Sequence, residues 1–197
     1  MISIIILAAG ESRRFGRNKL LIPISGVPMI RRIVMAALNS MVSEVVVVLG
    51  FEAELVRKVI EDLPCKIVVN ENYSLGMSSS VKVGFKAVSR DVDAVIVLPG
   101  DYPLIDSDVI NMVVKVYRET GAPIVIASYR GRRGHPVLFS STLFSELMEI
   151  NEETMGLKSI LRRHEREIVL AETGKIGVVL DVDVPEDFNR VLKIVNS

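Results

Sequence analysis

Short apolar runs rich in isoleucine and valine recur along this chain, and most are bounded by glycine, proline, asparagine or aspartate. Strands that are buried on both faces of a parallel sheet have this composition. The pattern predicts strands at Ile2–Ala8, Glu44–Leu49, Lys66–Val69, Ala94–Leu98 and Ile124–Ala127, with weaker ones near Val137–Phe139, Glu167–Leu170 and Val178–Leu180.

Helical patterns fall between these strands. They lie at Pro28–Ser40, Ala53–Glu61, Ser79–Val88, Asp106–Glu119, Thr142–Met148, Leu157–Arg163 and Pro185–Val195. This alternation favours right-handed crossovers and a three-layer α/β/α sandwich around a Rossmann-like, mostly parallel sheet. The length of 197 residues, without a linker or repeat, favours a single domain over residues 1–197. A Gly- and Arg-rich segment at about Tyr129–Pro136 is the exception and predicts a hairpin-like loop.

Charge and composition exclude several classes of protein. The 24 basic and 24 acidic side chains give a formal net charge of zero, and therefore no general attraction to nucleic acid. The apolar runs are shorter than the ~18 residues of a spanning helix, and no charged leader precedes the first strand. The lone Cys65 rules out an internal disulfide. We therefore expect a soluble, cytoplasmic protein with no nucleic-acid or membrane partner.

The loop after the first predicted strand is rich in anion-binding groups. Ligands of open parallel sheets bind at the carboxyl ends of the strands, which is where this loop lies. Gly10 allows close backbone approach, and Ser12, Arg13, Arg14 and Lys19 supply donors suited to phosphate oxygens. The glycine spacing matches neither the dinucleotide fingerprint nor the P-loop. The loop predicts an anion cradle of another type, with a solvated basic turn as the alternative.

Three aspartates follow predicted strands and are candidate metal ligands. Asp101 comes just after the fourth strand, whereas Asp181 and Asp183 follow the last one and, being two apart, point to the same side of an extended chain. Mg²⁺ favours one or two carboxylates together with phosphate oxygens and waters, so Asp101 needs one partner. The alternatives are a turn role for Asp101 and a helix-start role for Asp183, which precedes Pro185.

Polar residues near other strand ends are further candidates. Asn70 follows the third strand, and Ser79 and Ser80 open the next helix, whose N-terminus can bind polar or anionic groups or be capped by serine. Arg133 and His135 lie in the Gly- and Arg-rich segment, where arginine can bind phosphate in a bidentate manner. Incidental surface charge is the alternative for that segment.

Five segments in order resemble the signature of nucleotidyltransferases with a nucleotide-diphospho-sugar transferase fold. They look most like the molybdenum cofactor cytidylyltransferases, whose branch also holds the molybdopterin guanylyltransferases. The first segment reads L-A-A-G-x-S-x-R-x-G-x-x-K, and the five are Leu7–Lys19, Asn70–Ser80, Leu98–Leu104, Gly131–Val137 and Asp181–Asp187. The resemblance covers nearly the whole chain. It implies transfer of CMP from CTP to the phosphate of molybdopterin, with Mg²⁺ as cofactor and pyrophosphate as the other product.

The resemblance also assigns roles to individual residues. It implies catalytic roles for Arg14, Lys19 and Asp101, metal binding by Asp101, Asp183 and Asp181, and acceptor binding by Arg133 and His135. It implies nucleotide binding by Leu7, Ala8, Ala9, Gly10, Ser12, Arg13, Asn70, Ser79 and Ser80. Implied partners are a molybdenum insertion protein and a target oxidoreductase.

Departures from the family pattern bear on the substrates. The guanylyl branch typically reads L-A-G-G, so the methyl group of Ala9 favours a pyrimidine on steric grounds. Tyr102 and Val184 stand where the cytidylyl group often has Gln and Thr. Guanylyl transfer from GTP, a sugar- or polyol-phosphate nucleotidyltransferase, and a non-catalytic protein that delivers the finished cofactor stay open as alternatives.

Overall fold

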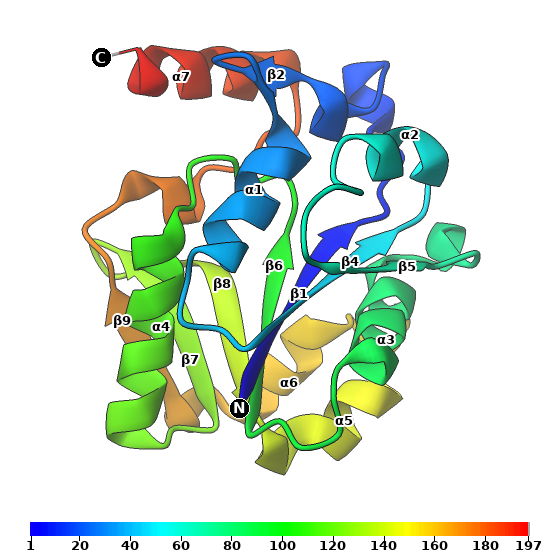
Figure 1. Cartoon of the computed structure of the whole chain (residues 1–197). Coiled ribbons are helices and arrows are strands. Elements are labelled where there is room, and N and C mark those ends of the chain that lie inside the picture. The colour runs from blue at the N-terminus through cyan, green and yellow to red at the C-terminus, as the bar shows by residue number, and fades with distance from the viewer. Residues whose placement is uncertain (197) are drawn as a thin grey trace.

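A seven-stranded sheet runs through the middle of the protein (Figure 1), whose computed structural model describes residues 1–196. The order across the sheet is β5-β4-β1-β6-β8-β7-β9. All neighbouring pairs are parallel except those that involve β8. The strands are β1 (Ile2–Ala8), β4 (Glu44–Leu49), β5 (Lys66–Val69), β6 (Ala94–Pro99), β7 (Ile124–Tyr129), β8 (Arg132–Ser140) and β9 (Ile168–Glu172).

Helices cover both faces of this sheet, which confirms the three-layer, mostly parallel architecture (Figure 1). Along β1, Ile4 and Ile6 pack into one apolar core and Ile5 and Leu7 into the other, because successive side chains of a strand point to opposite faces. The first core also holds side chains of α1 (Met29–Leu38), α2 (Ala53–Lys58), α4 (Ser107–Thr120) and α7 (Pro185–Val195). The second holds those of α3 (Met77–Ala87), α5 (Phe144–Glu149) and α6 (Leu157–Arg163).

Two short segments differ from the sequence prediction. A small hairpin, β2 (Pro23–Ile24) and β3 (Val27–Pro28), precedes α1 and was not predicted. The predicted strand Val178–Leu180 is wrong, because this segment forms the 3-10 helix η6 (Ile176–Val179). Gly177 packs so closely on Leu104 that an added Cβ would lie 2.7 Å from the Leu104 Cβ, while β9 takes the place beside β7. No helix within the described residues is long and apolar enough to cross a membrane.

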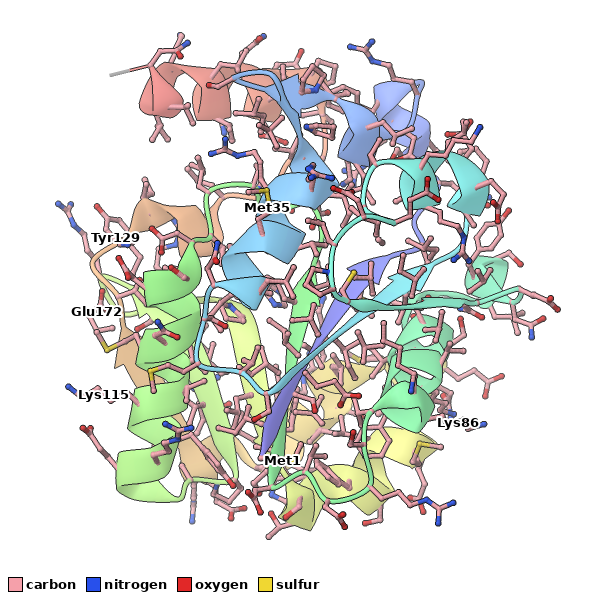
Figure 2. All side chains as sticks on the ribbon, in the orientation of Figure 1. Met1, Met35, Lys86, Lys115, Tyr129 and Glu172 are labelled. Atoms are coloured by element: carbon pink, nitrogen blue, oxygen red, sulfur yellow. The ribbon has the colours of Figure 1, made fainter. Side chains whose placement is uncertain are left out.

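The predicted loop at Tyr129–Pro136 is mostly strand. Only Arg130 and Gly131 form the turn between β7 and β8, and both have the positive φ angles, 50° and 74°, of a tight two-residue hairpin. The Glu172 carboxylate accepts hydrogen bonds from the backbone amides of Arg130 (2.9 Å) and Gly131 (3.1 Å). Figure 2 shows Tyr129 and Glu172 at the same corner of the molecule. Because β8 returns antiparallel to β6, the start of β8 lies at the edge where β6 ends.

His164 joins the end of α6 to α5. Its Nδ1 lies 2.7 Å from Glu167 Oε1, and its Nε2 lies 2.8 Å from Glu146 Oε1. The hydrogen bond to Glu167, supported by Glu146 and opposed by partial burial, raises the pKa of His164 above its ordinary 6.5. A raised pKa in the folded state means that protonation stabilises the fold. This contribution is fully present below the unfolded-state pKa and is lost as the pH rises through the folded-state pKa.

We expect His164→Gln to lower the melting temperature more at about pH 5 than at about pH 9, because the charged imidazole stabilises the fold only on the acid side. Thermal unfolding of both proteins, followed by circular dichroism at the two pH values, measures the difference. An equal loss at both pH values would contradict the role of the charge.

Candidate active site

A cavity of about 290 Å³ opens where β1 and β6 end and α3 begins. Among the residues singled out from the sequence, those that line it are Leu7, Ala9, Gly10, Ser12, Lys19, Ser80 and Asp101. Ala8 instead lies in the apolar core. The structure therefore brings together residues of the first, second and third matching segments at the carboxyl edge of the sheet, where parallel sheets bind their ligands.

The loop after β1 closes on itself through Ser12. Ser12 has a left-handed backbone conformation with φ 53°, and its Oγ accepts a hydrogen bond of 3.2 Å from the backbone amide of Lys19. Phe15, within the same loop, packs edge-on against Phe188 of α7. The loop is thus held at two points, by the hydrogen bond to Ser12 and by the packing of Phe15 against α7.

Lys19 links two of the predicted metal ligands. Its Nζ donates to Asp101 Oδ2 at 2.8 Å and to Asp183 Oδ1 at 2.9 Å, and its side chain is only 13% exposed. Arg14 Nη2 donates to the other oxygen of Asp183 at 2.7 Å. Burial alone would lower the pKa of Lys19, but the two carboxylates outweigh it and raise that pKa. The pKa of Asp183 is lowered, since its bonds to Lys19 and Arg14 outweigh its own burial.

Asp181 and Asp183 reach this place because the backbone between them is tied to Asp101. The amide of Val182 donates a 2.9 Å hydrogen bond to the carbonyl oxygen of Asp101, and the Val182 side chain is fully buried. Burial, with the nearby charges of Asp183 and Asp101, raises the pKa of the Asp181 carboxyl. Three carboxylates from two distant segments therefore share one site.

The donor set suits a Mg²⁺ ion that shares its ligands with a phosphate. Asp101 Oδ1 is buried and has no hydrogen-bond partner, so one carboxylate oxygen is available for a cation. Among residues 1–196, no group of three or more His, Cys, Asp or Glu side chains is placed to hold a metal ion, so Asp101, Asp181 and Asp183 do not form a three-carboxylate metal site in this arrangement. Mg²⁺ is commonly held by one or two carboxylates plus phosphate oxygens and waters. Asp101 and Asp183 supply carboxylates of this kind, and both oxygens of Asp183 accept hydrogen bonds from Lys19 and Arg14.

Asn70 fastens the loop after β5 to the start of α3. It is only 2% exposed, and its Nδ2 donates to Ser79 Oγ at 2.8 Å and to Ser80 Oγ at 2.9 Å. Its Oδ1 accepts from the amide of Asn72 at 3.0 Å. Of the three residues predicted here, Ser80 lines the cavity, while Asn70 and Ser79 line a separate recess. Asn70 thus supports the cavity wall indirectly, through its hydrogen bond to Ser80.

The predicted acceptor residues differ from one another in their surroundings. Arg133 is held by Glu165 through two hydrogen bonds of 2.9 and 2.8 Å. His135 packs against the ring of Tyr102 at 4.8 Å between centroids, and its Nδ1 is buried without a partner. Burial lowers the pKa of His135 to about 4, against the opposing effects of the Val97 backbone and Asp181. The imidazole is therefore neutral at physiological pH.

Comparison with known proteins connects this cavity to a family. Residues 4–168 match the model of the MobA-like NTP transferase domain, so the match spans the loop after β1, Asn70, Asp101 and the start of β8. The chain belongs to the MobA-like NTP transferase family. Nucleotidyl transfer is the activity that this membership supports.

Two curated relatives match this chain over nearly its full length. The purine catabolism protein PucB of Bacillus subtilis (strain 168) is 29% identical over 196 residues, which are 95% of this chain and 94% of that protein. The molybdenum cofactor cytidylyltransferase of Escherichia coli (strain K12) is 27% identical over 188 residues, 95% of this chain and 93% of that protein.

Solved structures share the fold. The crystal structure of Rv0371c from Mycobacterium tuberculosis H37Rv superposes with a TM-score of 0.85 at 24% identity, over 98% of this chain and 97% of that one. A complex of Rv0371c with manganese gives a TM-score of 0.78 at the same identity, over 98% of both chains. Both likenesses concern the fold, which is thereby established as that of the nucleotide-diphospho-sugar transferase type.

Other parts of the MobA-like site escaped the sequence analysis. Tyr73 and Met77 line the cavity, and Gly76 between them has φ 99° and faces Glu152. An added Cβ at Gly76 would lie 2.5 Å from the Glu152 Cδ, and the φ of 99° is one that residues with a side chain rarely adopt, so glycine is favoured here. In the sequence, Gly76 just before Ser78 is the one sign that this position is special. Nothing in the sequence indicates that it contacts Glu152, which follows α5.

Glu152 accepts a 2.7 Å hydrogen bond from the amide of Ser78 and thereby caps α3 from a distant segment. We expect Glu152→Ala to lower the free energy of unfolding by about 1 kcal/mol, because one of the free amides at the helix start loses its acceptor. Urea denaturation measures this loss. Glu153→Ala, at the exposed neighbouring position, is the matched control, and equal stabilities of the two variants would contradict the capping role.

Proposed function

We propose that this protein transfers CMP from CTP to the phosphate of molybdopterin, the organic part of the molybdenum cofactor, with release of pyrophosphate. The observation that carries the proposal is Lys19 bridging Asp101 and Asp183 beside the cavity lined by Ala9, Gly10 and Ser12. Such a site combines the cations that a triphosphate needs with the carboxylates that a metal needs. The full-length similarity to a molybdenum cofactor cytidylyltransferase supports the choice of acceptor.

Nucleotidyl transfer depends mainly on positioning and on charge stabilisation. In the proposed reaction, Lys19 and Arg14 donate to the triphosphate, while Gly10 and Ser12 let its oxygens approach the backbone of the loop. Arg13, which is 84% exposed and paired with Glu11, adds positive charge at the entrance. Asp101 and Asp183, backed by Asp181, would hold Mg²⁺, which supplies positive charge to the phosphates.

The base end of the cavity lies between the two loops that follow β1 and β5. Leu7 and Ala9 line it from one side and Ser80 from the other, while Asn70 and Ser79 hold the second loop in place. Ala9 lines this space, and we propose that its methyl group favours the smaller pyrimidine ring. We therefore propose CTP as the donor.

The acceptor end supports a second candidate. Arg133 is engaged by Glu165, His135 is neutral, and Asp181 lies nearby, so this side offers little positive charge. A pterin phosphate needs more cationic surface than a sugar or polyol phosphate does. A sugar- or polyol-phosphate nucleotidyltransferase is therefore the second proposal.

Under the first proposal, the product would pass to a molybdenum insertion protein and then to a target oxidoreductase.

Incubation with each of the four nucleoside triphosphates, Mg²⁺ and molybdenum cofactor tests the proposal directly. Mass detection of the product identifies both the base and the acceptor. We expect the cytosine dinucleotide form of the cofactor. Failure to modify molybdopterin, together with turnover of a sugar or polyol phosphate, would replace the first proposal by the second.

We expect the wild-type protein to bind CTP more tightly than GTP, and Ala9→Gly to narrow that difference. One methyl group contributes about 1–3 kcal/mol of discrimination, so the ratio of affinities should fall by roughly tenfold. Competition calorimetry with both nucleotides measures the ratio. Equal affinities in the wild-type protein would contradict the steric argument.

Asp101→Asn should keep the fold and lower turnover by more than ~100-fold, because the loss of a metal carboxylate raises the barrier by several kcal/mol. Initial rates at saturating CTP and Mg²⁺ measure the effect. Asp91→Asn, at an exposed position before β6, serves as the matched control. Near wild-type turnover of the Asp101 variant would show that this carboxylate is not needed for catalysis.

A further inference from the structure

Tyr73 stands where two recesses meet. It lines the 290 Å³ cavity and also a neighbouring recess of about 330 Å³, and both contain Ala9, Gly10 and Ser12. Lys19 and Asp101 line only the first recess, whereas Arg13 lines only the second. Tyr73 is therefore part of the wall that both recesses share with the loop after β1.

The place of Tyr73 is set by the residues after β4. An added Cβ at Gly50 would lie 2.7 Å from the Tyr73 Cβ and 2.7 Å from the Ala9 Cβ. Tyr73 and Ala9 can therefore both pack against Gly50 only because it has no side chain. The amide of Phe51 donates a 3.2 Å hydrogen bond to the carbonyl of Ala9. The Phe51 ring packs against the ring of Tyr73 at 6.3 Å between centroids. Tyr73 is thus held against Ala9 by a third segment of the chain.

We propose that Tyr73 contacts the base of the bound nucleotide and, with Ala9, determines the base specificity of the site. Among the described residues, Tyr73 is the one aromatic residue that lines the cavity, and an aromatic side chain offers the stacking surface that bases prefer. The phosphate-binding groups Lys19 and Arg14 belong to the other end of the same loop. Gly50 is a positioning residue, because it sets the distance between Tyr73 and Ala9. The inference rests on the nucleotide-binding part of the proposed function, and not on the identity of the acceptor.

A fluorescent variant tests the contact directly. The chain contains no tryptophan, so Tyr73→Trp introduces a single reporter and keeps an aromatic ring in place. We expect CTP with Mg²⁺ to quench this fluorescence, and inorganic tripolyphosphate, which has no base, to leave it unchanged. Tyr129→Trp is the matched control, since β7 is separated from β1 by β6 and β8, and CTP should not quench it. Equal fluorescence responses of Tyr73→Trp to CTP and tripolyphosphate would overturn the inference.

Calorimetry without acceptor gives the second readout. Tyr73→Leu should weaken CTP binding by about tenfold, as expected for the loss of one stacked base, while Tyr73→Phe keeps it within about twofold. Tripolyphosphate should bind the wild-type and both variants equally. Gly50→Ala should lower the preference for CTP over GTP, because its methyl group pushes Tyr73 and Ala9 apart. Unchanged CTP affinity in Tyr73→Leu, or an equal loss for tripolyphosphate, would overturn the inference.

These outcomes separate the inference from the proposed function. A protein that binds CTP through Tyr73 but transfers no nucleotide to molybdopterin would disprove the proposed reaction alone. A protein that transfers CMP normally after Tyr73→Leu, with unchanged affinity, would disprove the inference alone.

Discussion

The contact between Lys19 and two carboxylates is the interaction on which the candidate site depends. Lys19 belongs to the first loop, Asp101 follows β6, and Asp183 precedes α7, so one ammonium joins three distant parts of the chain. Half-buried like charges would repel one another without a cation between them, and an unpaired charge at this depth is costly. Arg14 adds a second cation to Asp183.

Because of this contact, nucleotide binding would require Lys19 and Arg14 to exchange carboxylate partners for phosphate oxygens. Lys19 and Arg14 are the donors proposed for the triphosphate, yet both now bind carboxylates. A bound nucleotide must therefore compete with Asp101 and Asp183, or a cation must neutralise them instead. The unpartnered Oδ1 of Asp101 offers one position at which a cation gains a ligand without breaking a hydrogen bond. Asp101 would thus belong to both the proposed metal site and the proposed triphosphate site.

Much of the fold follows from local patterns. The bounds of β1, β4 and β5, and those of α6 and α7, agree with the prediction because apolar periodicity and flanking turn residues are local properties. The predicted strand Val178–Leu180 was wrong because a short apolar run takes its conformation from what it packs against, here Leu104 and Gly134. The start of β8 was missed because it contains no apolar run and includes glycine, which is a poor strand former, and the pairing with β7 overrides that preference.

By itself the sequence determined the layered α/β architecture, and it predicted that the loop after β1 carries donors suited to phosphate. It also predicted that Asp101, Asp181 and Asp183 lie together, but the reason given for the last two was wrong. They follow a 3-10 helix and not a strand, and the hydrogen bond from the Val182 amide to the Asp101 carbonyl brings them to the end of β6. Tertiary structure alone decided which charges pair: Lys19 lies between two carboxylates, and Arg133 binds Glu165. Tertiary structure also placed Tyr73 against Ala9 and Glu152 at the start of α3. These contacts join residues far apart in the chain, and their geometry depends on how whole elements pack and not on any local pattern.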